Sequence, residues 1–253
     1  MSSNENPYQY YESEPFNERP NRAINTNSRY VYTDPTFITS VLLIFLIATI
    51  AVDFVGGVIS FWERVVLQNI QSGAYETEAA LQAAATASDM RVMVVALLQT
   101  FIAIISGIVF LVWTHRVCKN AHYLNMAPMA NTPGWAVGWY FVPVFLLWKP
   151  YQALREAFVA SCHPEGEQSS GTAIFGLWWF VHISAEILGQ ISMRMAFNIG
   201  DSPEMAYLLT LNGVGIAGGV VGILLNILAI IIALRFARCQ RETKGMIIID
   251  DFV

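Results

Sequence analysis

The chain has 253 residues, of which 55% are hydrophobic and only 13% are charged, and its formal net charge is -5. A soluble domain is about one quarter charged, so this composition excludes an ordinary soluble enzyme and a disulfide-rich secreted domain. Acidic balance without a basic patch also argues against binding to nucleic acid. The apolar residues occur in runs long enough to cross a bilayer, which predicts an all-α membrane protein.

Residues 1–36 form a polar segment rich in Asn, Tyr, Pro, Ser and Glu, without an aliphatic run. Such a composition cannot bury enough apolar surface to offset the entropy lost on ordering, so we expect a disordered cytoplasmic tail. The segment lacks the charged and then apolar order of a secretory leader. The first span is therefore expected to be an uncleaved anchor.

The membrane domain is expected to cover residues 37–235, because a helix needs roughly 20 apolar residues to cross the hydrocarbon core. The predicted spans are residues 37–62, 92–113, 172–193 and 206–234. A further apolar segment, 135–148, reaches only about 21 Å as a helix, and Pro143 interrupts its hydrogen bonds. We therefore expect four transmembrane helices in a compact antiparallel bundle. A re-entrant or interfacial helical hairpin, 135–160, should lie at its cytoplasmic end, and residues 236–253 should form a cytoplasmic tail.

The basic residues predict the orientation. Eleven of the 14 Lys and Arg residues lie in the two tails and in the loop after the second span, which four spans place on one side. Short segments rich in Lys and Arg remain in the cytoplasm, so both termini are expected there. Cys118, Cys162 and Cys239 fall on the same side, where thiols stay reduced. We therefore expect three free thiols.

Aromatic, basic and proline residues are concentrated between the second and third spans. Trp113, Arg116, Asn120, Ala121 and Leu124 precede the run Pro-Gly-Trp-Ala-Val-Gly-Trp-Tyr-Phe-Val-Pro at 133–143, which is followed by Leu-Trp-Lys-Pro-Tyr-Gln at 147–152 and by Arg155 and Glu156. These motifs resemble domain of unknown function 4328, a family of bacterial multi-span membrane proteins. The resemblance implies a location in the bacterial cytoplasmic membrane but no activity.

The same loop supplies a candidate site for lipid headgroups, because Trp favours the membrane interface while Arg and Lys bind phosphate. The candidate residues are Arg116, Lys119, Trp135, Trp139, Lys149 and Arg155. The alternative is that the basic side chains only anchor the protein at the inner face, cap helix carbonyls or pair with Glu156. The expected partners are the lipid bilayer and an anionic phospholipid, without nucleic acid.

Four of the polar residues inside the predicted spans are candidates for a function, namely Asp53, His182, Glu186 and Asn212. His182 and Glu186 share one helix face, and ionisable groups at membrane depth are costly and often functional. They predict either an internal hydrogen-bonded pair, with Asn212 or Gln190 as a neighbour, or a proton or ion path that includes Asp53. A metal site would need a third ligand, for which Asp53 is the best candidate. We expect no metal and no cofactor.

Glycines of the last span, Gly215, Gly218, Gly219 and Gly222, form two overlapping GxxxG patterns. Because glycine lets helix backbones approach closely, these residues predict a close helix contact. The contact could lie within the chain or join it to a second copy or another membrane protein.

The sequence contains no HExxH, GxSxG or glycine-rich phosphate motif, so no catalytic residue is assigned. We expect a non-enzymatic scaffold, accessory subunit or sensor that acts through protein or lipid contacts. The alternative is a small proton- or ion-coupled transporter that uses Asp53, His182 and Glu186. An intramembrane enzyme that acts on a lipid ranks last.

Overall fold

The computed structural model describes residues 29–162, 171–200 and 203–250. The disorder expected for most of the N-terminal tail therefore falls on residues 1–28, outside the described part of the chain. The long helices are α2 (Thr36–Gln71), α3 (Glu78–Leu124), α6 (Ala173–Phe197) and α7 (Met205–Asp250). The short elements are α4 (Pro133–Gly138), η2 (Trp139–Phe141), η3 (Phe145–Leu147) and α5 (Lys149–Ser161). The described residues contain no strand.

The four long helices are apolar and long enough to cross a membrane, and they cover the four predicted spans except for Thr172, which precedes α6. This confirms the predicted fold class. With 36, 47 and 46 residues, α2, α3 and α7 are longer than a bilayer requires, since about 20 residues suffice. α7 continues as a helix through most of the segment expected to be a C-terminal tail.

Local sequence explains where the helices begin and end. Gly73 has a φ of 69°, a conformation that glycine adopts readily, and it lies in the turn between α2 and α3. The Thr77 side chain caps α3 by accepting a hydrogen bond from the Ala80 N–H at 3.2 Å. Asn125 ends α3 in the left-handed conformation, with a φ of 50°, which is common at helix C-termini.

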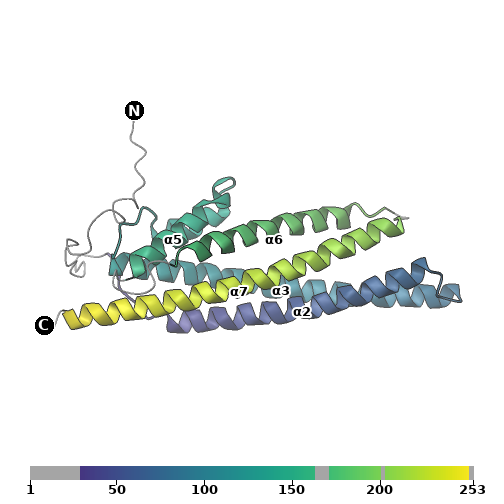
Figure 1. The fold of residues 1–253 in the computed structure, drawn as a ribbon, viewed down its shortest axis with the longest axis horizontal. Helices are drawn as coiled ribbons and strands as arrows, with labels where there is room; N and C mark the ends of the chain where they lie inside the picture. Colours follow the sequence, from purple (N-terminus) through teal and green to yellow (C-terminus); the bar gives the residue numbers. More distant parts are fainter. Residues whose placement is uncertain (1–28, 163–170, 201–202, 251–253) are drawn as a thin grey trace, which may run out of the picture.

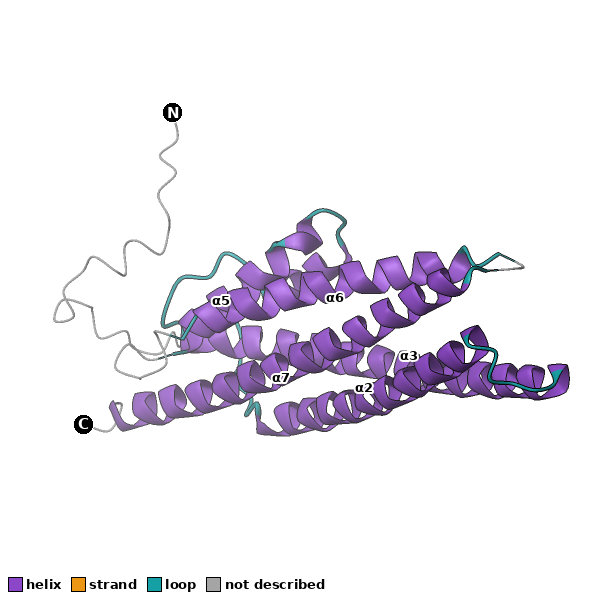
Figure 2. Ribbon diagram, turned by 45° about the vertical axis from the view of Figure 1, so that its right-hand side comes forward, coloured by secondary structure: helices purple, strands orange, loops and turns teal. Residues whose placement is uncertain are grey.

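The long helices pack side by side. α2 packs between α3 and α7, and α7 packs between α2 and α6 (Figure 1, Figure 2). α3 runs behind α7 in Figure 1 and also contacts α6 near one end, where the ring centroids of Phe110 and Trp178 are 5.8 Å apart. The hairpin from α4 to α5 packs against α3, α6 and α7 at one end of these helices, and it contains none of the described helices that are long and apolar enough to cross a membrane. We call this hairpin, residues 133–161, the cap.

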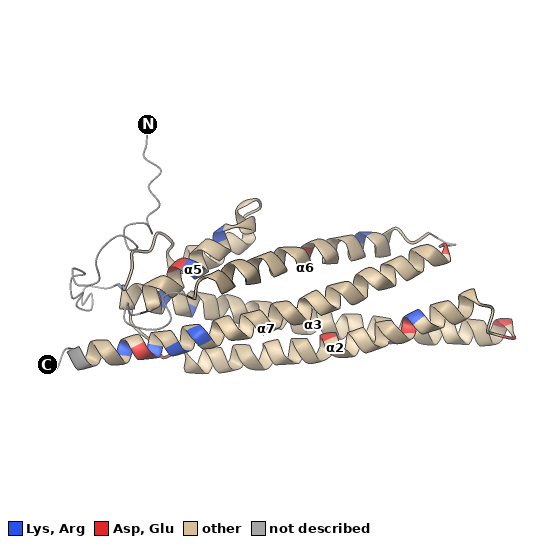
Figure 3. Cartoon of the chain, in the orientation of Figure 1, with Lys and Arg blue, Asp and Glu red and all other residues tan. Residues whose placement is uncertain are grey.

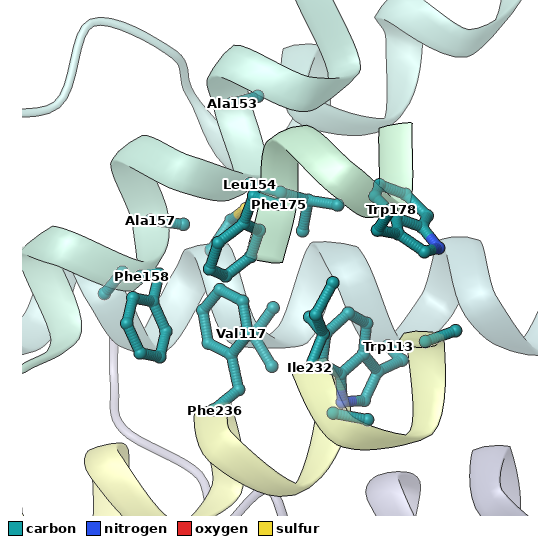
Figure 4. Close-up of a cluster of buried hydrophobic side chains, with 14 of the residues drawn as sticks. Trp113, Val117, Ala153, Leu154, Ala157, Phe158, Phe175, Trp178, Ile232 and Phe236 are labelled. Atoms are coloured by element: carbon teal, nitrogen blue, oxygen red, sulfur yellow. The ribbon is translucent and has the colours of Figure 1, made fainter. Parts of the chain in front are cut away.

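The main apolar core lies where the cap meets the long helices (Figure 4). The ring of Phe236 on α7 lies 5.3 Å from the ring of Trp113 on α3 and 5.2 Å from that of Phe158 on α5. Phe175 on α6 completes the group, 5.1 Å from Phe158. All four side chains are fully buried. The family motif around Trp113 thus contributes directly to the core that holds the cap.

The expectation of three free thiols is wrong, because Cys162 and Cys239 form a disulfide. The two residues are separated by 77 positions in the sequence, and they meet because the end of α5 packs on α7. Spacing alone could not reveal this contact. Among the described residues Cys118 is the free cysteine, and it is buried.

Charged side chains gather towards the ends of the helices, while the middle parts of the long helices are mostly uncharged (Figure 3). The N-terminal segment at Thr33, the end of α3 and the end of α7 lie together, because Asn120 binds both Thr33 and Gln240. The described parts of the three basic segments therefore lie at one end of the molecule, which is the arrangement that the predicted orientation requires.

Candidate functional site

A buried group of hydrogen-bonded side chains joins four segments at the capped end. Asn120 Nδ2 donates to Gln240 Oε1 at 2.9 Å and to the Thr33 carbonyl at 2.8 Å, and the Thr33 N–H donates to Asn120 Oδ1 at 3.0 Å. Gln240 Nε2 donates to the Val117 carbonyl at 2.8 Å and to Ser161 Oγ at 2.9 Å. Asn120, Ser161 and Gln240 are fully buried. We call Thr33, Asn120, Ser161 and Gln240 the polar joint.

Glu156 of α5 fixes the loop that leads into the cap. Its carboxylate accepts hydrogen bonds from the Ala130 N–H, from the Asn131 N–H at 3.3 Å and from Asn131 Nδ2 at 2.6 Å. Asn131 Oδ1 in turn accepts a hydrogen bond from Trp139 Nε1 at 2.9 Å. The motif residues Glu156 and Trp139 are therefore linked through a single asparagine that sequence reasoning did not single out.

A row of aromatic rings runs along the cap. Ring centroids are separated by 4.7 Å from Trp135 to Trp139, by 5.3 Å from Trp139 to Phe145 and by 5.6 Å from Phe145 to Trp148. Lys149 Nζ lies over the Trp139 ring at 5.7 Å. Trp135, Phe145 and Trp148 are exposed. An exposed aromatic row beside a lysine is typical of the membrane interface.

The predicted headgroup residues are only partly brought together. Trp135, Trp139 and Lys149 meet on the cap. Arg155 also belongs to the cap, in α5, whereas Arg116 and Lys119 lie on α3. The four basic side chains are half-buried. The structure thus places Lys149 against the aromatic row and leaves the other three cations elsewhere on α3 and α5.

Asp53 of α2 contacts side chains or backbone of both α3 and α7. Its Oδ1 accepts a hydrogen bond from Gln99 Nε2 of α3 at 3.1 Å. A Cβ atom at Gly222 of α7 would lie 3.3 Å from Asp53 Oδ2, and one at Gly56 would lie 2.7 Å from Gln99 Nε2. Gly222 therefore makes a close helix contact within the chain. Sequence reasoning missed Gln99, although an amide in the middle of a predicted span was a visible signal.

The other glycines of the pattern and Asn212 have different surroundings. Cβ atoms at Gly215, Gly218 and Gly219 would meet nothing within 4 Å. Asn212 Nδ2 donates to the Ser60 carbonyl and to Glu63 Oε2, both at 2.9 Å. Asn212 therefore binds α2, rather than the pair of His182 and Glu186 on α6.

His182 and Glu186 have unlike environments although they share a helix face. The His182 ring packs on the rings of Trp178 and Trp179, at centroid distances of 6.0 Å and 4.8 Å. The Glu186 side chain, one turn further along α6, is exposed. Asp53 lies on α2, and α7 separates α2 from α6. The three ionisable residues of the transport hypothesis thus occupy two helices that are not neighbours.

These features define a helical membrane protein in which a motif-rich cap closes one end of four long helices. The chain belongs to the family described as domain of unknown function 4328, which matches residues 76–238, more than half of the chain. The matched region begins just before α3, includes the whole cap and ends within α7. No curated protein and no solved structure matches the chain significantly.

Proposed function

We propose that this protein is a scaffold or accessory subunit that binds another membrane protein within the bilayer, along α6. The observation that carries the proposal is the exposed carboxyl group of Glu186 within a helix long and apolar enough to span the membrane. A charged side chain that faces lipid is costly, and such residues nearly always face protein or water. A partner helix with a hydrogen-bond donor at this depth would remove the carboxyl group from lipid.

The surroundings of Glu186 support a protein partner. Gly189 and Gln190 lie one turn further along the same face of α6, and both are exposed. A second long helix, α3, presents a stripe of small, exposed residues at spacings of three and four. These residues are Ala96, Thr100, Ala103 and Gly107. Small and polar residues are enriched where membrane helices contact one another.

Site-specific crosslinking in native membranes tests this proposal. A photoreactive amino acid replaces Gly189, beside Glu186, and a control variant carries it at Val220, an exposed residue of α7. We expect a discrete protein adduct from position 189, loss of that adduct in Glu186→Leu and retention in Glu186→Gln, which keeps hydrogen-bonding capacity. Adducts with lipid alone, or an adduct unchanged by Glu186→Leu, would contradict the proposal.

We also propose that the basic end faces the cytoplasm of the bacterial cytoplasmic membrane, with both termini on that side. In this arrangement the aromatic row of the cap lies at headgroup depth, and Lys149, Arg116 and Lys119 contact anionic phospholipid. Reporter fusions at each terminus test the orientation. Native mass spectrometry in nanodiscs tests the lipid contact, and Lys149→Gln should retain less phosphatidylglycerol than Lys244→Gln, a change of charge on α7 outside the cap. Equal retention would argue against a headgroup site on the cap.

A further inference from the structure

The disulfide joins the end of the cap to α7. Cys162 directly follows α5, the last helix of the cap, and Cys239 lies in α7. Their Cα atoms are 5.3 Å apart, within the range of about 4.4–6.8 Å that a disulfide requires. The bond therefore joins the end of the cap covalently to the C-terminal half of α7.

A second, non-covalent connection lies directly beside the disulfide. Ser161 precedes Cys162 and Gln240 follows Cys239, and Gln240 Nε2 donates to Ser161 Oγ at 2.9 Å. Gln240 also binds Asn120 and the Val117 carbonyl of α3. Because these hydrogen bonds do not depend on the two sulfur atoms, the helices can stay together with the disulfide open. The fold thus supports both an oxidised and a reduced form.

The basic residues near this cysteine pair indicate on which side of the membrane the disulfide lies. Arg238 and Arg241 lie close to Cys239 in the sequence. Arg116 and Lys119 are neighbours in α3 of Val117 and Asn120, which both bind Gln240, and Arg155 lies in α5. Under the proposed orientation this end faces the cytoplasm, where thiols are kept reduced. A disulfide there forms and opens with the redox state of the compartment.

We propose that Cys162 and Cys239 form a reversible redox link that fastens the cap to α7 when oxidised and loosens it when reduced. In the reducing direction, a dithiol reductant attacks one sulfur atom and forms a mixed disulfide, which its second thiol resolves. Two electrons and two protons pass to the cysteines, and the reductant becomes a disulfide. In the oxidising direction, a small disulfide such as oxidised glutathione accepts the two electrons and leaves as two thiols.

The expected consequence is a change in the stability of α5. This helix carries Glu156, which holds the loop at Ala130 and Asn131. Opening the link removes the covalent anchor at the end of α5 and leaves the Ser161–Gln240 hydrogen bond and apolar packing. Amide exchange along Lys149–Ser161 should therefore become severalfold faster in the reduced form, because local opening of the helix costs less free energy.

The test uses the full-length protein in native membranes, treated with dithiothreitol or diamide, then acid-quenched, denatured and labelled with a maleimide that adds a fixed mass. Since the chain has 3 cysteines, the reduced form should carry three labels and the oxidised form only the label on Cys118. We expect the two treatments to interconvert these forms, while Cys162→Ser and Cys239→Ser each give two labels throughout. One label despite dithiothreitol, or three labels despite diamide, would overturn the proposal.

Hydrogen exchange on the same two wild-type samples provides the second measurement, so the proposal does not depend on whether a cysteine variant folds. Equal exchange of α5 in the oxidised and reduced forms would refute a role in fastening the cap. A reporter at the C-terminus reads the orientation independently. An outward-facing C-terminus would contradict the proposed topology, whereas the label count would still decide whether the link is reversible.

Discussion

Replacing Gln240 with methionine, which has a similar length, should destabilise the protein by about 2–4 kcal/mol. The change removes three buried hydrogen bonds, to Asn120, the Val117 carbonyl and Ser161, each with a net contribution of about 0.5–1.5 kcal/mol. The cost stays moderate because Asn120 Nδ2 keeps its bond to Thr33 and Ser161 Oγ still donates to the Ala157 carbonyl at 2.7 Å.

Thermal unfolding in nanodiscs measures this effect. A chain of this size loses about 2–4 °C of Tm per kcal/mol, so Gln240→Met should lower Tm by about 5–15 °C. The matched control is Gln152→Met, since Gln152 is exposed on the cap and surface changes usually stay within about 0.5 kcal/mol. The double variant with Asn120→Leu should lose less than the sum of the two single losses, because the partners are removed together. Equal Tm values for Gln240→Met and Gln152→Met would refute the importance of the polar joint.

Three further predictions concern other contacts. Gly222→Leu should destabilise the protein by about 1–3 kcal/mol through overpacking, because a Cβ atom added there would lie 3.3 Å from Asp53 Oδ2. Gly218→Leu should lower Tm less, since a Cβ atom added there would meet nothing within 4 Å. Equal Tm shifts for the two variants would contradict the close contact at Gly222. The buried thiol of Cys118 should resist a maleimide in folded protein and react after denaturation, and rapid labelling of native protein would argue against its burial. Burial and, to a smaller extent, Asp34 raise the pKa of Tyr32 from 10.0 to about 12, so its neutral form is favoured in the fold. The resulting stability is present below pH 10 and lost as the pH rises through 12, and Tyr32→Phe should flatten the dependence of Tm on pH in this window.

The cap illustrates how much of the site could be predicted. Pro143 and the short apolar segment 135–148 correctly predicted an interrupted hairpin, because both depend on local geometry. The contacts that hold this hairpin were not predicted. Asn131 links Glu156 to Trp139, and nothing in its sequence neighbourhood marks it as different from any other loop asparagine.

The sequence alone determined that the chain is helical, that it contains four segments apolar and long enough to cross a membrane, and that 11 of its 14 basic residues lie in the two tails and one loop. These properties follow from hydrophobic length and from the order of charges along the chain, which no packing can change. The tertiary structure alone decided the packing order of α3, α2, α7 and α6, the contact of Asp53 with Gln99 and the bond between Cys162 and Cys239. Each of these depends on how far one helix is rotated and shifted against another. For long apolar helices many rotations bury similar surface, so only side-chain packing and the few buried hydrogen bonds select one.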